Sequence, residues 1–240
     1  MWKNILINIQ ELSTALLELN KMKNVVIYGE TAFAERIYSY IKFEKCMNVL
    51  AFTNARTFKK RDKIQGIPVI AFEDLDKELK NFDFSILIAI GYVQMNNIRK
   101  KIYQECKDAG HRIATYISKT STIYSCNIGE GCIIMPNVYI GPNCNIGNCN
   151  IIASSTCLSH DNNIGNFNFI SSNAIFGGHS TVCNNCFIGL GCVIRDGITI
   201  NDYSLIGSAT NLLSSTEPEC IYVGNPSRKL TGKNSLNSKI

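Results

Sequence analysis

The chain has 240 residues, enough for one large domain or two ordinary ones, and 45% of them are apolar, enough to bury a substantial core. The net charge is +5 with 18% charged residues and no long basic run, which argues against a nucleic-acid-binding protein. The longest apolar stretches have the length of strands, so the sequence predicts no membrane span and no signal peptide, and it favours a cytoplasmic protein.

Residues 1–22 carry apolar side chains at helical spacing, which predicts an amphipathic helix that packs on the body of the protein or on a neighbouring subunit. We assign this segment no chemical role. The pattern consists of Trp2, Ile5, Leu6, Ile9, Leu12, Leu16 and Leu19.

Residues 23–117 alternate strand and helix patterns, which predicts a small Rossmann-like α/β domain with a parallel sheet. Ligands bind at the carboxyl ends of such strands, and a glycine that leads into a helix offers bare amides to a phosphate. Gly29, Thr31 and Ala32 form such a turn, although the glycine could also serve only the tight turn itself. The expected strands cover residues 24–29, 48–53, 67–70 and 84–91, and the expected helices cover 31–43, about 73–80 and 93–109.

Two more strands are expected to end on the same edge of the sheet. Thr53 and Asn54 follow the second strand, and Gly91 and Tyr92 follow the fourth. The full GxGxxG fingerprint is missing, so the pattern favours a sugar nucleotide over a dinucleotide cofactor.

A six-residue repeat runs without a break from Ile128 to Glu217. All fifteen register residues are apolar, and the fifth place of each hexad is mostly small. Three hexads make one triangular coil, so residues eighteen apart lie above one another, and residues 118–217 are predicted to form a left-handed parallel β-helix of five coils. Residues 218–240 form a closing segment. The register residues are Ile128, Ile134, Ile140, Ile146, Ile152, Leu158, Ile164, Ile170, Phe176, Val182, Ile188, Ile194, Ile200, Ile206 and Leu212.

A solenoid of this kind is expected to have flat polar faces and no deep pocket. A ligand site then needs a second surface, which predicts a homotrimer with clefts between the prisms. Many of the eleven cysteines fall on the small interior place, for example Cys132, Cys144 and Cys186. We therefore interpret them as packing residues, free thiols in a reducing compartment, and not as disulfides or metal ligands.

The chain has three histidines, of which His160 is the candidate catalytic residue. A neutral imidazole that points outward from a hexad can take the proton of an amine or hydroxyl as it attacks a thioester. Asp161 could fix its tautomer only if the turn bends the carboxylate back, because neighbours on a strand point to opposite faces. A lone histidine on such a face can equally be an ordinary surface residue.

We interpret the other two histidines as structural or surface residues without a catalytic role. His179 lies nineteen residues after His160 and could border the same cleft, but its GGHS context favours an exposed corner. His111 precedes a strand. Because the chain does not place three histidines where they could converge between subunits, no zinc site is predicted.

From about Lys23 to Leu230 the chain resembles the hexapeptide-repeat sugar acetyltransferases with an N-terminal nucleotide-sugar-binding domain. This group contains the bacillosamine and perosamine N-acetyltransferases and the sialic acid O-acetyltransferases. The resemblance rests on the VVIYG strand and turn, IQGIPVI, ILIAIG, the hexads with a single SHD, and the closing GNPSRKL.

The resemblance implies acetyl-CoA as co-substrate, lying along the prism between subunits, and a nucleotide-linked sugar under the N-terminal domain. It implies His160 as general base with Asp161 as acidic partner. Thr31, Ala32, Phe33, Thr53 and Asn54 fall where the family holds the sugar nucleotide, and Phe169, Leu190 and Ser208 fall along the acetyl-CoA path.

The chain departs from the family at three places. Phe33 and Phe169 replace family histidines, and Thr53 with Asn54 replaces an acidic residue. Because His160 and Phe169 are half a coil apart, they can meet only across a subunit boundary.

The leading hypothesis is an acetyl-CoA-dependent N-acetyltransferase that acts on the amino group of a nucleotide-linked amino-deoxysugar for surface glycan biosynthesis, by direct attack in a ternary complex. One alternative is a sugar O-acetyltransferase with a sialic-acid-like or polysaccharide acceptor. The other is a non-catalytic trimeric sugar-nucleotide-binding module that has lost turnover through the changes at Phe33 and Phe169.

Overall fold

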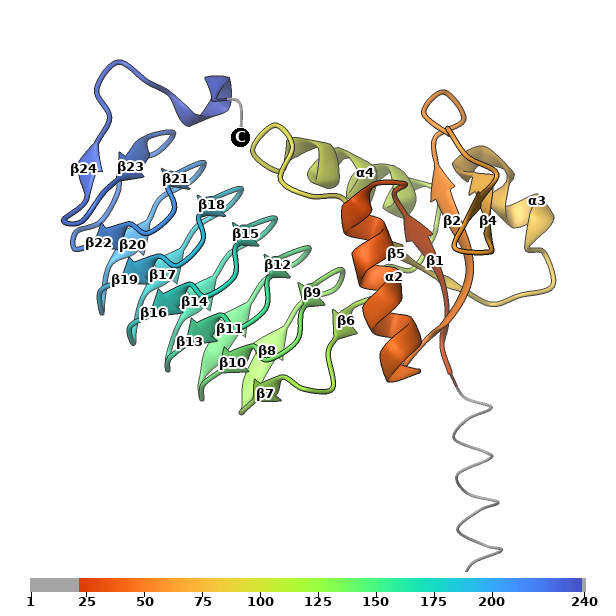
Figure 1. Ribbon diagram of the computed structural model, residues 1–240, viewed down its shortest axis with the longest axis horizontal. Coiled ribbons are helices and arrows are strands. Elements are labelled where there is room, and N and C mark those ends of the chain that lie inside the picture. The colour runs from red at the N-terminus through yellow and green to blue at the C-terminus, as the bar shows by residue number, and fades with distance from the viewer. Residues whose placement is uncertain (1–21, 239–240) are drawn as a thin grey trace, which may run out of the picture.

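The computed structural model describes residues 22–238, which form an α/β domain followed by a triangular prism of stacked strands (Figure 1). The helix expected over residues 1–22 lies outside the described residues, apart from Met22. No helix in the described range is both long and apolar enough to cross a bilayer.

The N-terminal domain is built on a five-stranded sheet in the order β3-β4-β2-β1-β5. Its four longer strands pair in parallel, as the alternating pattern predicts. The short β3 was not predicted; it pairs antiparallel with β4 through a turn at Gln65 and Gly66, whose φ angles of 47° and 86° are those of a tight two-residue hairpin. The elements are β1 (Asn24–Tyr28), α2 (Ala32–Glu44), β2 (Asn48–Asn54), β3 (Lys63–Ile64), β4 (Ile67–Ala71), η1 (Phe72–Asp74), α3 (Leu75–Glu78), β5 (Ser85–Ile88) and α4 (Asn97–Asp108).

The helix expected over residues 93–109 begins only at Asn97, because the three residues before it adopt left-handed conformations. Met95 is buried in a cluster with apolar residues of the prism. The side-chain amide of Asn96 donates to the carbonyl of Cys186 at 3.1 Å. Contact with the prism therefore overrides the helical pattern at this end.

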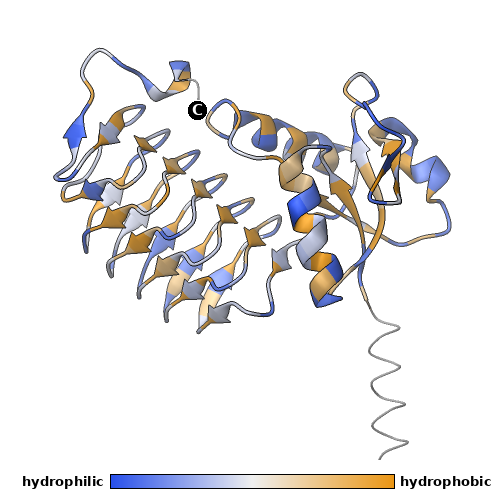
Figure 2. Cartoon of the chain, viewed as in Figure 1, coloured by the Kyte–Doolittle hydropathy of each residue, from blue (hydrophilic) through white to orange (hydrophobic). Residues whose placement is uncertain are grey.

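The C-terminal domain is a left-handed parallel β-helix, as the six-residue period predicts. Each of the fifteen register residues is the last residue of one of the strands β8 to β22, and fourteen of them are buried, while Ile128 at the open end is half-buried. Hydropathy colouring shows apolar residues along the prism strands (Figure 2). Two earlier strands, β6 and β7, were missed because Ile117 and Ile123 pair with residues only seventeen positions later, which shifts the period by one.

Three sheets form the faces of the prism, and we name them by what they present outward. The domain-side face comprises β6 (Tyr116–Ile117), β9 (Ile133–Ile134), β12 (Ile151–Ile152), β15 (Phe169–Ile170), β18 (Phe187–Ile188), β21 (Leu205–Ile206), β23 (Ile221–Val223) and the antiparallel β24 (Arg228–Lys229). The apolar face comprises β7 (Thr122–Ile123), β10 (Tyr139–Ile140), β13 (Cys157–Leu158), β16 (Ile175–Phe176), β19 (Val193–Ile194) and β22 (Asn211–Leu212). The polar face comprises β8 (Cys126–Ile128), β11 (Cys144–Ile146), β14 (Asn163–Ile164), β17 (Thr181–Val182) and β20 (Thr199–Ile200), and a short η2 (Ser235–Asn237) follows the prism.

The expectation of polar outer faces is wrong for one of the three sheets. Tyr139, Ile175 and Val193 point outward from the apolar face and expose 38%, 50% and 45% of their surfaces. On the polar face, by contrast, Asn127 and Asn145 form a side-chain ladder at 3.0 Å. An exposed apolar stripe on a rigid sheet is typical of a surface that another protein surface covers.

The small residue at the fifth place of each hexad often supplies a hydrogen-bond donor as well as space. Asn168 donates to the carbonyl of Cys183 at 2.8 Å, Ser180 donates to a turn carbonyl fifteen residues later at 3.1 Å, and the Cys132 thiol does the same at 3.1 Å. Burial raises the pKa of Cys132 to about 11, so its thiol keeps its proton. All eleven cysteines are free, six of them buried and five half-buried, so their interpretation as packing residues stays a prediction.

Arg99 of α4 joins the two domains. Its side chain is fully buried, and its guanidinium donates to five backbone carbonyls: those of Ile90 and Gly91 at 3.2 and 2.8 Å, Cys149 at 3.1 Å, and Phe167 and Asn168 at 3.0 Å each. Burial lowers the pKa of Arg99 to about 10, so it remains cationic at neutral pH. A buried cation is tolerated only when its donors are satisfied, and here carbonyl oxygens satisfy them.

Replacing Arg99 with Met keeps the length of the side chain but leaves these carbonyls without a donor, so we expect a loss of about 3 kcal/mol of stability. Thermal unfolding followed by circular dichroism measures it. The matched control is Arg112→Met, because Arg112 is exposed and pairs only with exposed groups; it should change stability by no more than about 0.5 kcal/mol. Equal effects of the two substitutions would contradict the role of Arg99.

Candidate functional site

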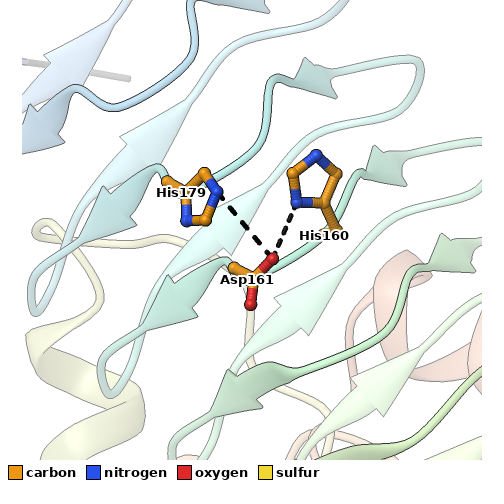
Figure 3. A group of neighbouring side chains, drawn as sticks. All are labelled: His160, Asp161 and His179. Carbon is orange, nitrogen blue, oxygen red and sulfur yellow. Dashed lines mark hydrogen bonds and ion pairs between the residues drawn. The ribbon is translucent and has the colours of Figure 1, made fainter.

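His160 and Asp161 form the turn between β13 and β14, at the corner of the prism where the apolar and polar faces meet. Asp161 has a φ of 55°, a left-handed conformation that reverses the chain. Its carboxylate therefore bends back and lies 2.7 Å from Nδ1 of His160 (Figure 3). The condition that sequence reasoning set for a working pair is met by the geometry of this turn.

The hydrogen-bond partners of the pair define the ionisation of Asp161 and the orientation of the His160 ring. Hydrogen bonding to His160 is the main cause that holds the pKa of Asp161 below its usual value, and Asn143 adds a second hydrogen bond at 3.2 Å. The ionised carboxylate makes Nδ1 the proton-bearing nitrogen of the ring, which leaves the lone pair on Nε2. Because half of the His160 side-chain surface is exposed, a substrate can reach that nitrogen.

The next coil leaves room for the ring of His160. Gly178 lies eighteen residues later, directly above it, and a Cβ there would come within 2.6 Å of Nε2. The amide of Gly178 is held by Asp196 at 2.7 Å. Any side chain at position 178 would therefore clash with the ring of His160 in this orientation, and the sequence did not indicate this.

His179 is an exposed corner residue, as expected, but it also borders the His160 pair. It lies one coil above Asp161, and its Nε2 is 4.0 Å from the same carboxylate oxygen that His160 contacts. The two imidazole rings are 5.1 Å apart. His111, in contrast, lies between Phe72 and Phe84, which agrees with a structural role.

At the N-terminal domain, the strand ends converge as predicted. The amide of Gly29 donates to the carbonyl of Thr53 at 2.8 Å, and a Cβ on Gly29 would lie 2.8 Å from the carbonyl of Ala89. The close approach requires a glycine whether or not a ligand binds. Thr31 and Ala32 are exposed at the start of α2, where free amides point outward.

The other predicted residues on this edge differ in their exposure. Thr53 is fully buried, and its hydroxyl has no hydrogen-bond partner among the described residues. The side chain of Asn54 bonds within the turn that follows β2, where its Oδ1 accepts a hydrogen bond from the amide of Ala55 at 3.1 Å. The carbonyl of Gly91 is held by Arg99.

A basic loop beside this edge was missed by sequence reasoning. Arg61 donates to Glu35 of α2 at 2.8 Å, and the carboxylate of Glu30 accepts from the amides of Lys60 and Arg61 at 3.1 Å. These contacts fold the loop over the first turn of α2. The run Lys59, Lys60 and Arg61, which begins five residues after the end of the second strand, was the available signal.

An open pocket of about 370 Å³ lies between the N-terminal domain and the domain-side face. Tyr92 and Phe169 approach to 4.9 Å between ring centroids, Phe169 and Phe187 stack at 5.7 Å, and Phe33 lies 6.3 Å from Phe169. Five of the predicted residues therefore meet here. The lining residues include Phe33, Arg36, Tyr40, Tyr92, Phe169, Phe187, Leu190 and Ser208.

Within one chain, this pocket and His160 do not meet. Phe169 lies on the domain-side face, and His160 lies at the corner opposite that face. The width of the prism separates them.

Two family models match the chain. The PglD N-terminal domain matches residues 24–106, and the GMPPB C-terminal domain matches residues 117–217. Together they follow the division between the α/β domain and the prism.

Solved structures share the whole architecture. PerB from Caulobacter crescentus, in complex with CoA and GDP-perosamine, has a TM-score of 0.77 and 22% identity over 86% of this chain and 97% of that one. The acetyltransferase domain of PglB from Neisseria gonorrhoeae, in complex with acetyl coenzyme A, has a TM-score of 0.77 and 19% identity over 87% of this chain and 100% of that one. WeeI from Acinetobacter baumannii has a TM-score of 0.61 and 19% identity over the same shares.

At these identities the structures demonstrate a common fold, and the family model adds the type of N-terminal domain. The chain thus combines a domain that matches the PglD N-terminal domain with a solenoid that matches the GMPPB C-terminal domain, in the domain order and fold of these solved structures.

Proposed function

We propose that this protein transfers the acetyl group of acetyl-CoA to the amino group of a nucleotide-linked amino-deoxysugar, with His160 as general base. The observation that carries the proposal is the short contact of 2.7 Å between His160 and Asp161, which leaves Nε2 free at an exposed corner. Complexes of similar structures with CoA, acetyl-CoA and GDP-perosamine support both substrates. The free thiols agree with a cytoplasmic reaction.

The proposed reaction is a direct attack in a ternary complex. The amine nitrogen forms a bond to the thioester carbon while Nε2 of His160 removes its proton, and the carboxylate of Asp161 stabilises the imidazolium that results. The carbon–sulfur bond then breaks, and the imidazolium returns the proton to the leaving thiolate of CoA. The products are an N-acetylated sugar nucleotide and free CoA.

We propose that the sugar nucleotide binds along the strand ends of the N-terminal domain. Its phosphates would meet the exposed amides at Thr31 and Ala32 and the positive charge of Arg61 and Lys60, whose loop folds over that turn. The sugar would then extend toward the aromatic pocket around Tyr92 and Phe169. Leu190 and Ser208 on the pocket wall suit the acetyl-CoA path.

We propose a homotrimer in which each active site is shared between two chains. The exposed stripe of Tyr139, Ile175 and Val193 is a surface that a second copy can cover. Because His160 and the pocket lie on opposite sides of one prism, packing copies side by side would place the His160 corner of one chain beside the pocket of the next.

Replacing His160 with Asn should leave sugar-nucleotide binding intact and lower acetyl transfer by about 10²–10⁴-fold. The assay incubates the protein with acetyl-CoA and a panel of amino- and hydroxy-sugar nucleotides, and it reads thiol release and product mass. Product from the amino sugars alone supports N-transfer, and product from the hydroxy sugars alone would favour the O-acetyltransferase alternative. Unchanged turnover of His160→Asn would remove His160 as the base.

Replacing Gly178 with Ala should displace the ring of His160 and lower kcat while the fold is kept, because the new methyl group meets the end of a side chain that can swing away. We expect a loss of about 10-fold or more, since general bases depend on hydrogen-bond reach to the proton they remove. Thermal unfolding of the same variant is the control. Full activity in a normally folded protein would show that the ring orientation is unimportant.

Mixing two inactive variants tests the shared site. His160→Asn removes the base, and Ser208→Trp fills the pocket; co-expression of the two should restore activity in about a quarter of the sites under random assembly. Each variant alone should stay inactive. If the mixture is inactive although native mass spectrometry shows trimers that contain both variants, the site lies within one chain.

A further inference from the structure

The corner that carries His160 holds a cluster with more ligand atoms than acetyl transfer needs. One ligand atom from each of His160, Asp161 and His179 lies within 4.8 Å of the others (Figure 3). Oδ2 of Asp161 lies 2.7 Å from Nδ1 of His160 and 4.0 Å from Nε2 of His179. His179 has no part in the proposed transfer.

The scaffold holds these three groups in place. Asp161 and His179 occupy the same corner of successive coils with φ angles of 55° and 58°, and the amide of His179 donates to the carbonyl of His160 at 3.0 Å. Asn143 holds the other carboxylate oxygen, Oδ1, at 3.2 Å, which leaves Oδ2 directed at the two rings. A cluster on stacked coils is more precisely placed than one on a mobile loop.

The donor set selects a class of ion. Two imidazoles and one carboxylate suit divalent transition ions such as Zn²⁺, and three protein ligands leave a position open for water. All three side chains are partly or fully exposed, so an ion can enter from solvent. This site differs from the one that sequence reasoning rejected, because it uses a carboxylate and lies within a single chain.

We propose that His160, Asp161 and His179 bind a divalent transition ion such as Zn²⁺, and that the bound ion reversibly inhibits the protein. To admit the ion, the hydrogen bond between Nδ1 of His160 and Asp161 opens, and Nδ1 becomes a ligand. The ring proton moves from Nδ1 to Nε2. The nitrogen that would accept the substrate proton is then already protonated, so the ion acts as an inhibitor and not as a cofactor.

The binding part stands on the cluster alone, whereas the inhibition part rests on the proposed function. Binding is tested by titrating the full-length, chelator-treated protein with Co²⁺ and following its visible spectrum, with Zn²⁺ as competitor. We expect one ion per chain, without the intense near-ultraviolet bands of thiolate ligands. His179→Asn loses a direct ligand, so its affinity should fall by more than the roughly 10–100-fold that loss of an outer-shell partner costs.

Two controls separate this site from the thiols and from the base. Cys157 is a half-buried thiol on the apolar face, and the Cys157→Ser variant should bind Co²⁺ as the wild type does. His179→Asn should keep acetyl transfer but resist Zn²⁺, whereas the wild type should lose activity at the Zn²⁺ concentrations that fill the site and regain it with EDTA.

The outcomes distinguish the two proposals. Wild-type affinity in His179→Asn, or a thiolate spectrum, would overturn the metal site and leave the transferase proposal untouched. Saturated binding without inhibition would overturn the inhibitory role, whereas only unchanged turnover of His160→Asn would overturn His160 as the base.

Discussion

The relation of the two domains depends on one buried cation. The side chain of Arg99 extends from α4 of the N-terminal domain toward the prism. All five of its N–H groups donate to backbone carbonyls, which belong to both domains. Carbonyl oxygens, unlike a carboxylate, are fixed by the backbone, so the guanidinium connects two rigid frameworks. Because two of its acceptors belong to Ile90 and Gly91, the same contacts set the position of the loop that leads to Tyr92 and the aromatic pocket. The proposed site therefore depends for its geometry on a buried residue whose donors all bond to backbone carbonyls.

The residues of the proposed site lie in two regions that differ in how the fold builds them. At the His160 corner, regular stacking places each residue above the one eighteen positions earlier, so Gly178 lies over the ring of His160, which contacts Asp161. At the pocket, irregular segments of the N-terminal domain meet the domain-side face through aromatic rings. The His160 corner belongs to the regular prism and provides the His160–Asp161 pair. The aromatic pocket is formed by less regular segments and provides a concave surface. The proposed trimer is the simplest way to bring the two together.

The sequence predicted what depends on periodicity and missed what depends on contacts between distant segments. The fifteen register residues lie in the interior because size and polarity alone decide their place. The predicted start of α4 was wrong because Met95 and Asn96 contact the prism. The sequence around these two residues does not indicate that contact. His179 was interpreted by its glycine-rich context, yet its relation to Asp161 follows from counting eighteen residues back. The apolar stripe could also have been found by reading Tyr139, Ile175 and Val193 at that spacing.

The position of Arg99 along the prism has a consequence for how this architecture can change. Its acceptors at Cys149 and at Phe167 sit on consecutive coils, and the chain between them is the single turn that carries His160. At Arg99 the N-terminal domain is therefore anchored at the height of the proposed base, while Met95 and Asn96 contact later coils. Adding a whole coil beyond the last of these contacts would lengthen the prism by about 4.8 Å without moving the proposed base relative to Arg99. The length of the prism can therefore grow while the distance between Arg99 and His160 stays constant.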